Sequence, residues 1–113
     1  FNLITAGRNY GWPLVSEGSN YGGGAIPRHT TRPDFAAPLV SWTPVISPGG
    51  MIQYRGTRFI GWTGDFLLAG LSSQGLIRVR VSGNAAAEVA RIPLEARIRE
   101  VEEGSDGAIW VLE

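Results

Sequence analysis

Two arginines near the carboxyl end of the chain have the spacing that best suits ligand chemistry. Arg97 and Arg99 are two positions apart. On a β-strand, side chains at i and i+2 project from the same face, so two planar guanidinium groups can converge on one anionic ligand. The same pair could instead form a solvated strand face that pairs with Glu95, Glu100 or Glu102. The residues alone leave both interpretations open.

A second pair of arginines has the same spacing. Arg78 and Arg80 alternate with Ile77, Val79 and Val81. This period of two is typical of a strand that buries one face and exposes the other to water. We therefore expect both arginines to lie on the surface.

Other residues that could carry out catalysis are few. The single histidine, His29, belongs to no Ser/His/Asp pattern, and we expect it to be solvent-facing or locally hydrogen-bonded. The glycines at 22–24 open no helix of a β-α-β unit and there is no lysine, which excludes a dinucleotide fold and a P-loop. Glycoside hydrolysis needs two carboxylates across a cleft, whereas carboxylates clustered on one strand end are typical of a solvated rim. That cluster consists of Glu100, Glu102, Glu103 and Asp106.

Composition excludes several classes of function. The 113 residues carry a formal net charge of zero, and all ten basic residues are arginine. A nucleic-acid module usually shows a clustered basic excess, so this class is disfavoured. The absence of cysteine excludes disulfides, thiolate metal sites and a cysteine nucleophile. No apolar run approaches the roughly 20 residues of a membrane-spanning helix.

The chain divides into two regions of different texture. Residues 1–50 are rich in glycine and proline, which excludes long helices and predicts an ordered loop region packed by aromatic side chains. Residues 51–113 read as short antiparallel strands separated by turn residues. The predicted strands are 51–55, 65–69, 76–81, 88–92, 97–102 and 108–112. The three alanines in 85–91 also permit a helix, but such a helix would be too short to be stable alone.

The predicted class is all-β. Strands at intervals of about 10 residues with glycine-rich turns fit a sandwich, a barrel or propeller blades. A blade takes roughly 40 to 50 residues, so the chain would hold about two blades, which cannot close a ring. Two blades alone would leave strand edges and apolar faces open.

Four motifs, in order along the chain, resemble the soluble PQQ-dependent sugar dehydrogenases, the glucose/sorbosone dehydrogenase family, which includes the aldose sugar dehydrogenases. The resemblance runs essentially from end to end. The first motif is Asn9-Tyr10-Gly11-Trp12-Pro13, and the second is Trp42-Thr43-Pro44 with Pro48-Gly49-Gly50-Met51 and Tyr54. The third is Trp62-Thr63-Gly64-Asp65-Phe66-Leu67 with Gly70-Leu71, and the fourth is Arg97-Ile98-Arg99-Glu100-Val101 with Gly104 and Asp106-Gly107.

The resemblance implies a six-bladed β-propeller that holds pyrroloquinoline quinone (PQQ) and calcium and oxidises an aldose to its lactone. The chain would be the C-terminal blade pair of such an enzyme, over residues 1–113. In that family the general base is a histidine of an early blade. Because His29 does not match that motif, we expect no catalytic residue in this chain. A periplasmic or secreted location is implied for the parent enzyme.

The resemblance also implies a set of binding residues. Tyr10 would supply a backbone carbonyl to calcium, although calcium needs six to eight oxygens, so binding by this chain alone would be weak or absent. Ser72 stands where many relatives have lysine. The residues implied to contact PQQ are Tyr21, Gly70, Leu71, Ser72, Arg97, Ile98 and Arg99.

Two functions of different classes follow. The first is a part of a PQQ-dependent aldose dehydrogenase that contributes to the cofactor pocket and has an aldose as substrate, with no nucleic-acid partner. The second is a non-catalytic module derived from that family, which either binds a partner or self-assembles through its open blade edges. The Arg97-Ile98-Arg99 motif favours the first.

Overall fold

The computed structural model describes residues 1–113, in two compact units, Phe1–Val45 and Ile46–Glu113. The boundary between the two units lies a few residues before position 51, where the predicted loop region gives way to predicted strands. Each unit is described separately below. The structure contains no helix with the length and apolarity needed to cross a membrane.

The first unit consists mainly of ordered loop. Its one helical element is the short 3-10 helix η1(His29–Thr31), and Ser19 and Ala25 form an isolated antiparallel bridge. Gly11 has a φ of +93°, and a Cβ there would lie 2.1 Å from the Val15 side chain, which is itself buried. The first motif therefore needs a glycine for close packing as well as for backbone conformation.

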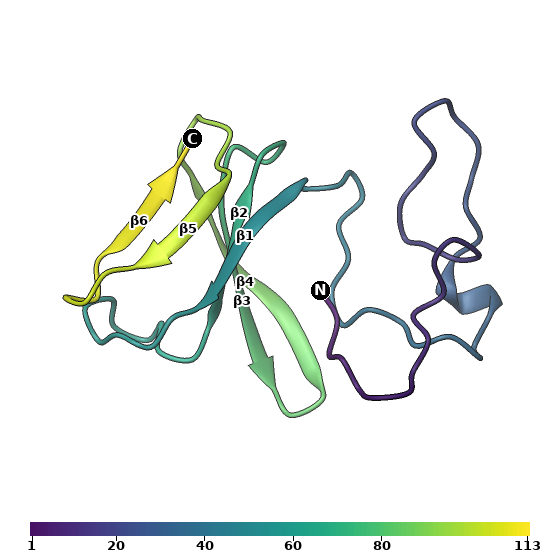
Figure 1. The fold of residues 1–113 in the computed structure, drawn as a ribbon, viewed down its shortest axis with the longest axis horizontal. Coiled ribbons are helices and arrows are strands. Elements are labelled where there is room, and N and C mark those ends of the chain that lie inside the picture. The colour runs from purple at the N-terminus through teal and green to yellow at the C-terminus, as the bar shows by residue number, and fades with distance from the viewer. The chain divides into compact units, whose positions relative to one another are not determined.

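The second unit contains six antiparallel strands in two sheets, as Figure 1 shows. A four-stranded meander has the order β1-β2-β3-β4, and β5 and β6 form a separate hairpin. The bounds are β1(Pro48–Gln53), β2(Phe66–Gly70), β3(Gly75–Ser82), β4(Ala85–Pro93), β5(Glu100–Glu103) and β6(Ile109–Leu112). The predicted all-β class is confirmed, and four strands are the number found in one propeller blade.

The position of each strand in the sheet explains its burial. Leu67, Leu68 and Ala69 of the inner strand β2 are all buried, since both faces of that strand are covered. The outer strand β4 alternates between exposed and half-buried positions. Strand β4 includes the alanine-rich stretch, because cross-strand pairing with β3 stabilises an extended chain whose helical alternative would be short.

The core of the second unit lies where the two sheets meet. Tyr54, Leu67 and Leu76 pack with Ile98 and Val101, which precede and occupy β5. Tyr54 is fully buried, and its hydroxyl donates a hydrogen bond of 2.9 Å to the carbonyl of Gly107. This bond joins the residue that follows β1 to the β5–β6 turn.

Candidate functional site

The main chain of segment 97–99 is held by backbone hydrogen bonds, although the segment lies just before β5 rather than within it. The amide of Ile98 donates to the carbonyl of Gly70 at 3.3 Å, and the amide of Arg99 donates to that of Leu112 at 2.7 Å. The carbonyl of Arg99 accepts from the amide of Gly50 at 2.8 Å. Three different parts of the second unit therefore fix the main chain between the two arginines.

Burial alternates along this segment. Ile98 is 2% exposed and anchors the segment in the core, whereas Arg97 and Arg99 on either side of it are exposed. This alternation is the pattern expected for two side chains on the same face of an extended chain.

Neither Arg97 nor Arg99 forms an ion pair. The predicted alternative, pairing with Glu95, Glu100 or Glu102, does not occur: no glutamate lies within ion-pair distance of either guanidinium, and Glu100 accepts a hydrogen bond from the amide of Val101. Six other arginines of the chain are paired with carboxylates, namely Arg28, Arg32, Arg58, Arg78, Arg80 and Arg91. The two guanidinium groups are thus free to bind an external anion.

The predicted segment Gly70, Leu71 and Ser72 lies directly beside segment 97–99, through the hydrogen bond from Ile98 to Gly70. Gly70 ends β2, Leu71 is half-buried and Ser72 is exposed. A Cβ at Gly70 would lie against the hydroxyl of Ser73 and 3.2 Å from the carbonyl of Gly75, so a larger residue here would force the Ser73 side chain to move. The second unit therefore places the two predicted segments, 70–72 and 97–99, next to each other. Ser72 lies at the exposed end of the turn.

This group of residues fits a cofactor with several carboxylates. Each guanidinium offers a planar fork of donors to a carboxylate, and the exposed hydroxyl of Ser72 adds a weaker polar group. The hydroxyl of Ser73 is buried without a hydrogen-bond partner, but it faces Gly70 and takes no part in the donor set.

Tyr21 belongs to the first unit and is fully exposed there. It lies in a tight loop in which Gly23 donates to the carbonyl of Asn20 at 3.1 Å, and both Gly23 and Gly24 have positive φ. The loop borders a hollow of about 630 Å³, a volume within the usual range for small-molecule sites. The hollow is lined by Gly18, Ser19, Asn20, Tyr21, Trp42, Thr43, Pro44 and Val45.

The surroundings of Tyr10 do not fit a calcium site within this chain. Its carbonyl lies 3.0 Å from Nε2 of His29, and its hydroxyl donates to the carbonyl of Leu3. The structure contains no group of three acidic, histidine or cysteine side chains that could hold a metal. One carbonyl falls far short of the six to eight oxygens that calcium needs. The role of Tyr10 as a ligand stays a prediction.

His29 is the locally bonded histidine that the sequence allows. It is buried, and its Nδ1 lies 3.1 Å from a carboxylate oxygen of Glu17. Arg28 also contacts Glu17, and these hydrogen bonds, the Arg28 bond first, lower the pKa of the Glu17 carboxyl. Both ring nitrogens face oxygen atoms of this chain, those of Glu17 and Tyr10, so neither points toward a substrate.

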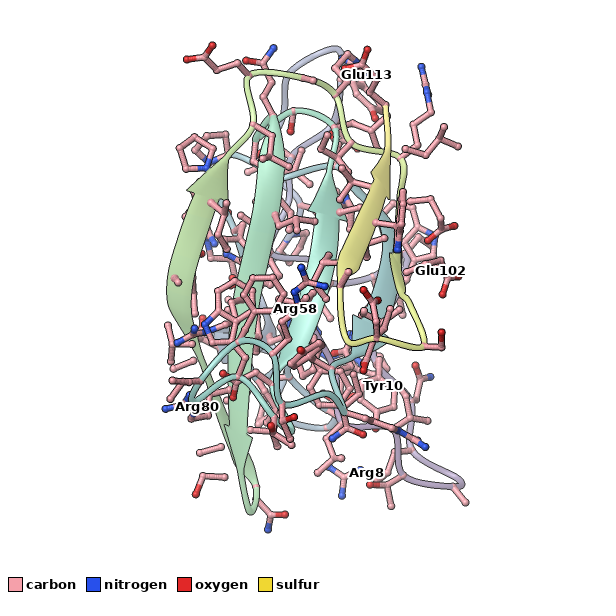
Figure 2. The ribbon with its side chains drawn as sticks, turned by 90° about the vertical axis from the view of Figure 1, so that its left-hand side faces the viewer. Arg8, Tyr10, Arg58, Arg80, Glu102 and Glu113 are labelled. Carbon is pink, nitrogen blue, oxygen red and sulfur yellow. The ribbon has the colours of Figure 1, made fainter.

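The carboxylates at the β5–β6 hairpin have mainly structural contacts. Glu103 accepts a hydrogen bond from the amide of Arg55, and Glu102 projects away from β5 into solvent (Figure 2). Asp106 bonds the amide of Ala108 and pairs with Arg58, and these contacts, the amide first, lower the pKa of the Asp106 carboxyl.

Sequence reasoning missed a buried ionic cluster around Asp65. This carboxylate is 3% exposed and accepts two hydrogen bonds of 2.8 Å from Arg80, and Nε of Arg78 lies 3.2 Å away in an ion pair without a hydrogen bond. Arg78 also stacks over Trp62 at 4.8 Å. The expectation that Arg78 lies on the surface is therefore wrong, because Arg78 pairs with the buried carboxylate of Asp65, which immediately precedes β2. Arg80 is exposed as expected, and Figure 2 shows it on β3.

Comparison with known proteins gives concordant results. The family model described as Glucose / Sorbosone dehydrogenase matches residues 1–113. The chain is 32% identical over 117 residues to the aldose sugar dehydrogenase YliI of Escherichia coli K12, and the match covers 98% of the chain and 31% of that protein.

Solved structures agree with this match. A crystal structure of a glucose dehydrogenase is similar with a TM-score of 0.83 and 36% identity, over 97% of the chain and 33% of that protein. The PQQ-bound form of an aldose sugar dehydrogenase from Streptomyces coelicolor is similar with a TM-score of 0.65 and 31% identity, over 97% and 28%. The chain thus spans about a third of the length of the relatives it matches.

Proposed function

We propose, since this chain belongs to the glucose/sorbosone dehydrogenase family, that it forms part of the PQQ pocket of an enzyme that oxidises an aldose to its lactone. The observation that carries the proposal is the pair of unpaired guanidinium groups beside the Gly70 turn. A surface pair without function would gain from nearby glutamates, and this pair has no such contact although glutamates flank it in the sequence.

The roles proposed for the chain are binding and orientation. Arg97 and Arg99 would each bind a carboxylate or quinone oxygen of PQQ, and Leu71 would cover one face of its ring system. When bound, PQQ supplies the two-electron oxidant for the sugar. The backbone bonds of segment 97–99 fix the positions from which the two side chains extend, so little conformational entropy would be lost from the main chain on binding.

The proton acceptor would come from residues outside these 113. Abstraction of the anomeric hydroxyl proton needs a base with a free nitrogen or carboxylate. His29 has neither nitrogen free, and its partner Glu17 is bound by Arg28 as well. We further propose that the four-stranded sheet is one blade of a six-bladed propeller, and that β5 and β6 are half of the next blade.

The test is PQQ binding by the full-length polypeptide that carries these residues. We expect Arg97→Gln and Arg99→Gln each to raise the Kd for PQQ about tenfold or more, since a hydrogen bond to a charged group contributes about 1.5–3 kcal/mol. Arg91→Gln is the matched control, because Arg91 is paired with Glu88 on β4 and should leave the Kd unchanged. Equal Kd values for all variants, or no aldose oxidation with added PQQ and calcium, would refute the proposal.

One observation supports the alternative of a self-assembling module. Strand β6 is at the edge of its two-stranded sheet, and its Trp110 and Leu112 are 67% and 62% exposed. An edge strand with large apolar side chains can pair with another chain. Sedimentation tests this: a chain that stays at its monomer mass of 12.1 kDa contradicts self-assembly.

A further inference from the structure

The loop that carries Tyr21 is closed at its base by backbone hydrogen bonding. We define the Tyr21 loop as residues 16–27. The amide of Ser16 donates to the carbonyl of Pro27 at 2.9 Å, and the Ser19–Ala25 bridge pairs the two arms nearer the tip. The tip itself has three successive glycines after Tyr21. A loop of this kind has a fixed base and a tip whose position depends on how the base is held.

Glu17, at the base of the loop, joins both walls of the hollow. Its carboxylate accepts hydrogen bonds from Arg28 at 2.8 Å and from the amide of His29 at 3.2 Å. Its carbonyl accepts from the hydroxyl of Thr43 at 2.7 Å, and Thr43 belongs to the opposite wall. The spacing of the two walls, 18–21 and 42–45, therefore depends on the position of Glu17.

His29 connects this base to the first motif. Its Nδ1 faces Glu17, and its Nε2 faces the carbonyl of Tyr10 at 3.0 Å. The ring is only 9% exposed, so its orientation is constrained by packing as well as by these two contacts. Without the imidazole of His29, the Glu17 carboxylate keeps its bonds from Arg28 and from the backbone amide of residue 29, whereas the carbonyl of Tyr10 loses its link to the loop.

We propose that His29 is a positioning residue that clamps the Tyr21 loop to the Tyr10 carbonyl and so fixes the walls of the hollow. This inference rests on the proposed function and, for its cofactor role, on the contact of Tyr21 with PQQ that the family resemblance implies. The clamp to the Tyr10 carbonyl requires the ring proton on Nε2, which then donates to that oxygen, and it needs no metal at Tyr10. It acts on binding through the loop, and His29 itself touches no substrate.

The two nitrogens of His29 can be tested separately by substitution. His29→Gln places an amide near the position of Nε2 and can still donate to the Tyr10 carbonyl. His29→Asn places its amide near Nδ1 and reaches only Glu17. Thr30→Ala is the matched control, since Thr30 is the exposed neighbour in the same turn. Thr43→Val releases the other wall and provides a second test if His29→Asn fails to fold.

Two measurements on the full-length protein decide the inference. Amide hydrogen exchange in residues 18–25 should be about tenfold faster in His29→Asn, the effect of losing one net hydrogen bond, and unchanged within about twofold in His29→Gln and Thr30→Ala. The Kd for PQQ should follow the same order, and Thr43→Val should accelerate exchange in 42–45. Exchange in the strands of the second unit should not change.

The outcomes separate this inference from the proposed function. Equal effects of His29→Gln and His29→Asn, or faster exchange throughout the protein, would show that the ring only fills space and would overturn the clamp. If the wild-type protein does not bind PQQ, the proposed function fails and the cofactor role of the clamp fails with it. The exchange pattern would then still decide whether His29 holds the loop.

Discussion

The buried carboxylate of Asp65 offers the sharpest test of how the second unit is stabilised. Asp65→Asn keeps the size of the side chain and removes its charge, which leaves Arg78 without a counter-ion. The side chain of Arg78 is 16% exposed and that of Arg80 is 49% exposed. Breaking a buried ion pair costs about 3–5 kcal/mol, and the partial exposure of Arg80 reduces this, so we expect a loss of about 2–3 kcal/mol.

Denaturant unfolding measures this loss directly, with far-UV circular dichroism as the signal. For a unit of this size the thermal midpoint should fall by about 10–20 °C. Asp106→Asn is the matched control: its pair with Arg58 is exposed on both sides, and the substitution keeps the acceptor for the Ala108 amide. We expect no measurable change in the control.

A second substitution tests the physical cause. Arg78→Met in the Asp65→Asn background removes the uncompensated charge and should recover part of the lost stability, because an apolar side chain suits the half-buried site against Trp62. Two results would refute this reasoning: Asp65→Asn is no more destabilising than Asp106→Asn, or Arg78→Met lowers the free energy of unfolding of Asp65→Asn further. Either would show that burial does not determine how much this ion pair contributes to stability.

Three further predictions follow from the contacts. Gly49→Ala places a Cβ 2.2 Å from the carbonyl of Arg99, so it should destabilise the protein by about 1–3 kcal/mol in denaturant unfolding and also weaken PQQ binding; an unchanged Kd would contradict the coupling. Tyr54→Phe leaves a buried carbonyl without its donor and should cost about 1–2 kcal/mol by the same assay. The hydrogen bond from Arg28 lowers the pKa of the Glu17 carboxyl below 4.5. The ionised carboxylate of Glu17 therefore contributes its full stabilisation above pH 4.5, and this contribution is lost as the pH falls through the lowered pKa. A thermal midpoint that does not change with pH in that range would refute this.

The strands could be predicted from the sequence because turn residues and period-two patterning mark them locally. The six predicted strands all correspond to strands, but β5 begins at Glu100 rather than at position 97. The backbone hydrogen bonds of segment 97–99 run to three different parts of the unit, which interrupts regular strand pairing. Long-range crossings of this kind leave no local signal.

The arrangement of the candidate site could be predicted in part for the same reason, and its ligand role stays a prediction. The spacing of Arg97 and Arg99 predicts two side chains on one face, and the alternation around Ile98 agrees with it. That the two arginines lack glutamate partners depends on side-chain directions, which the sequence does not contain. The clusters around Asp65 and His29 join residues far apart in the chain, such as Glu17 with His29, so only the fold reveals them.

The backbone at Arg99 has a consequence for redesign. Its amide and carbonyl are bonded to main-chain atoms of Leu112 and Gly50, and neither bond involves a side chain. Ligand preference at this position can therefore be altered independently of folding. At the proposed anion site, exchanging the two guanidinium groups for carboxylates or amides would therefore change the chemistry of the side chains while leaving these main-chain bonds in place.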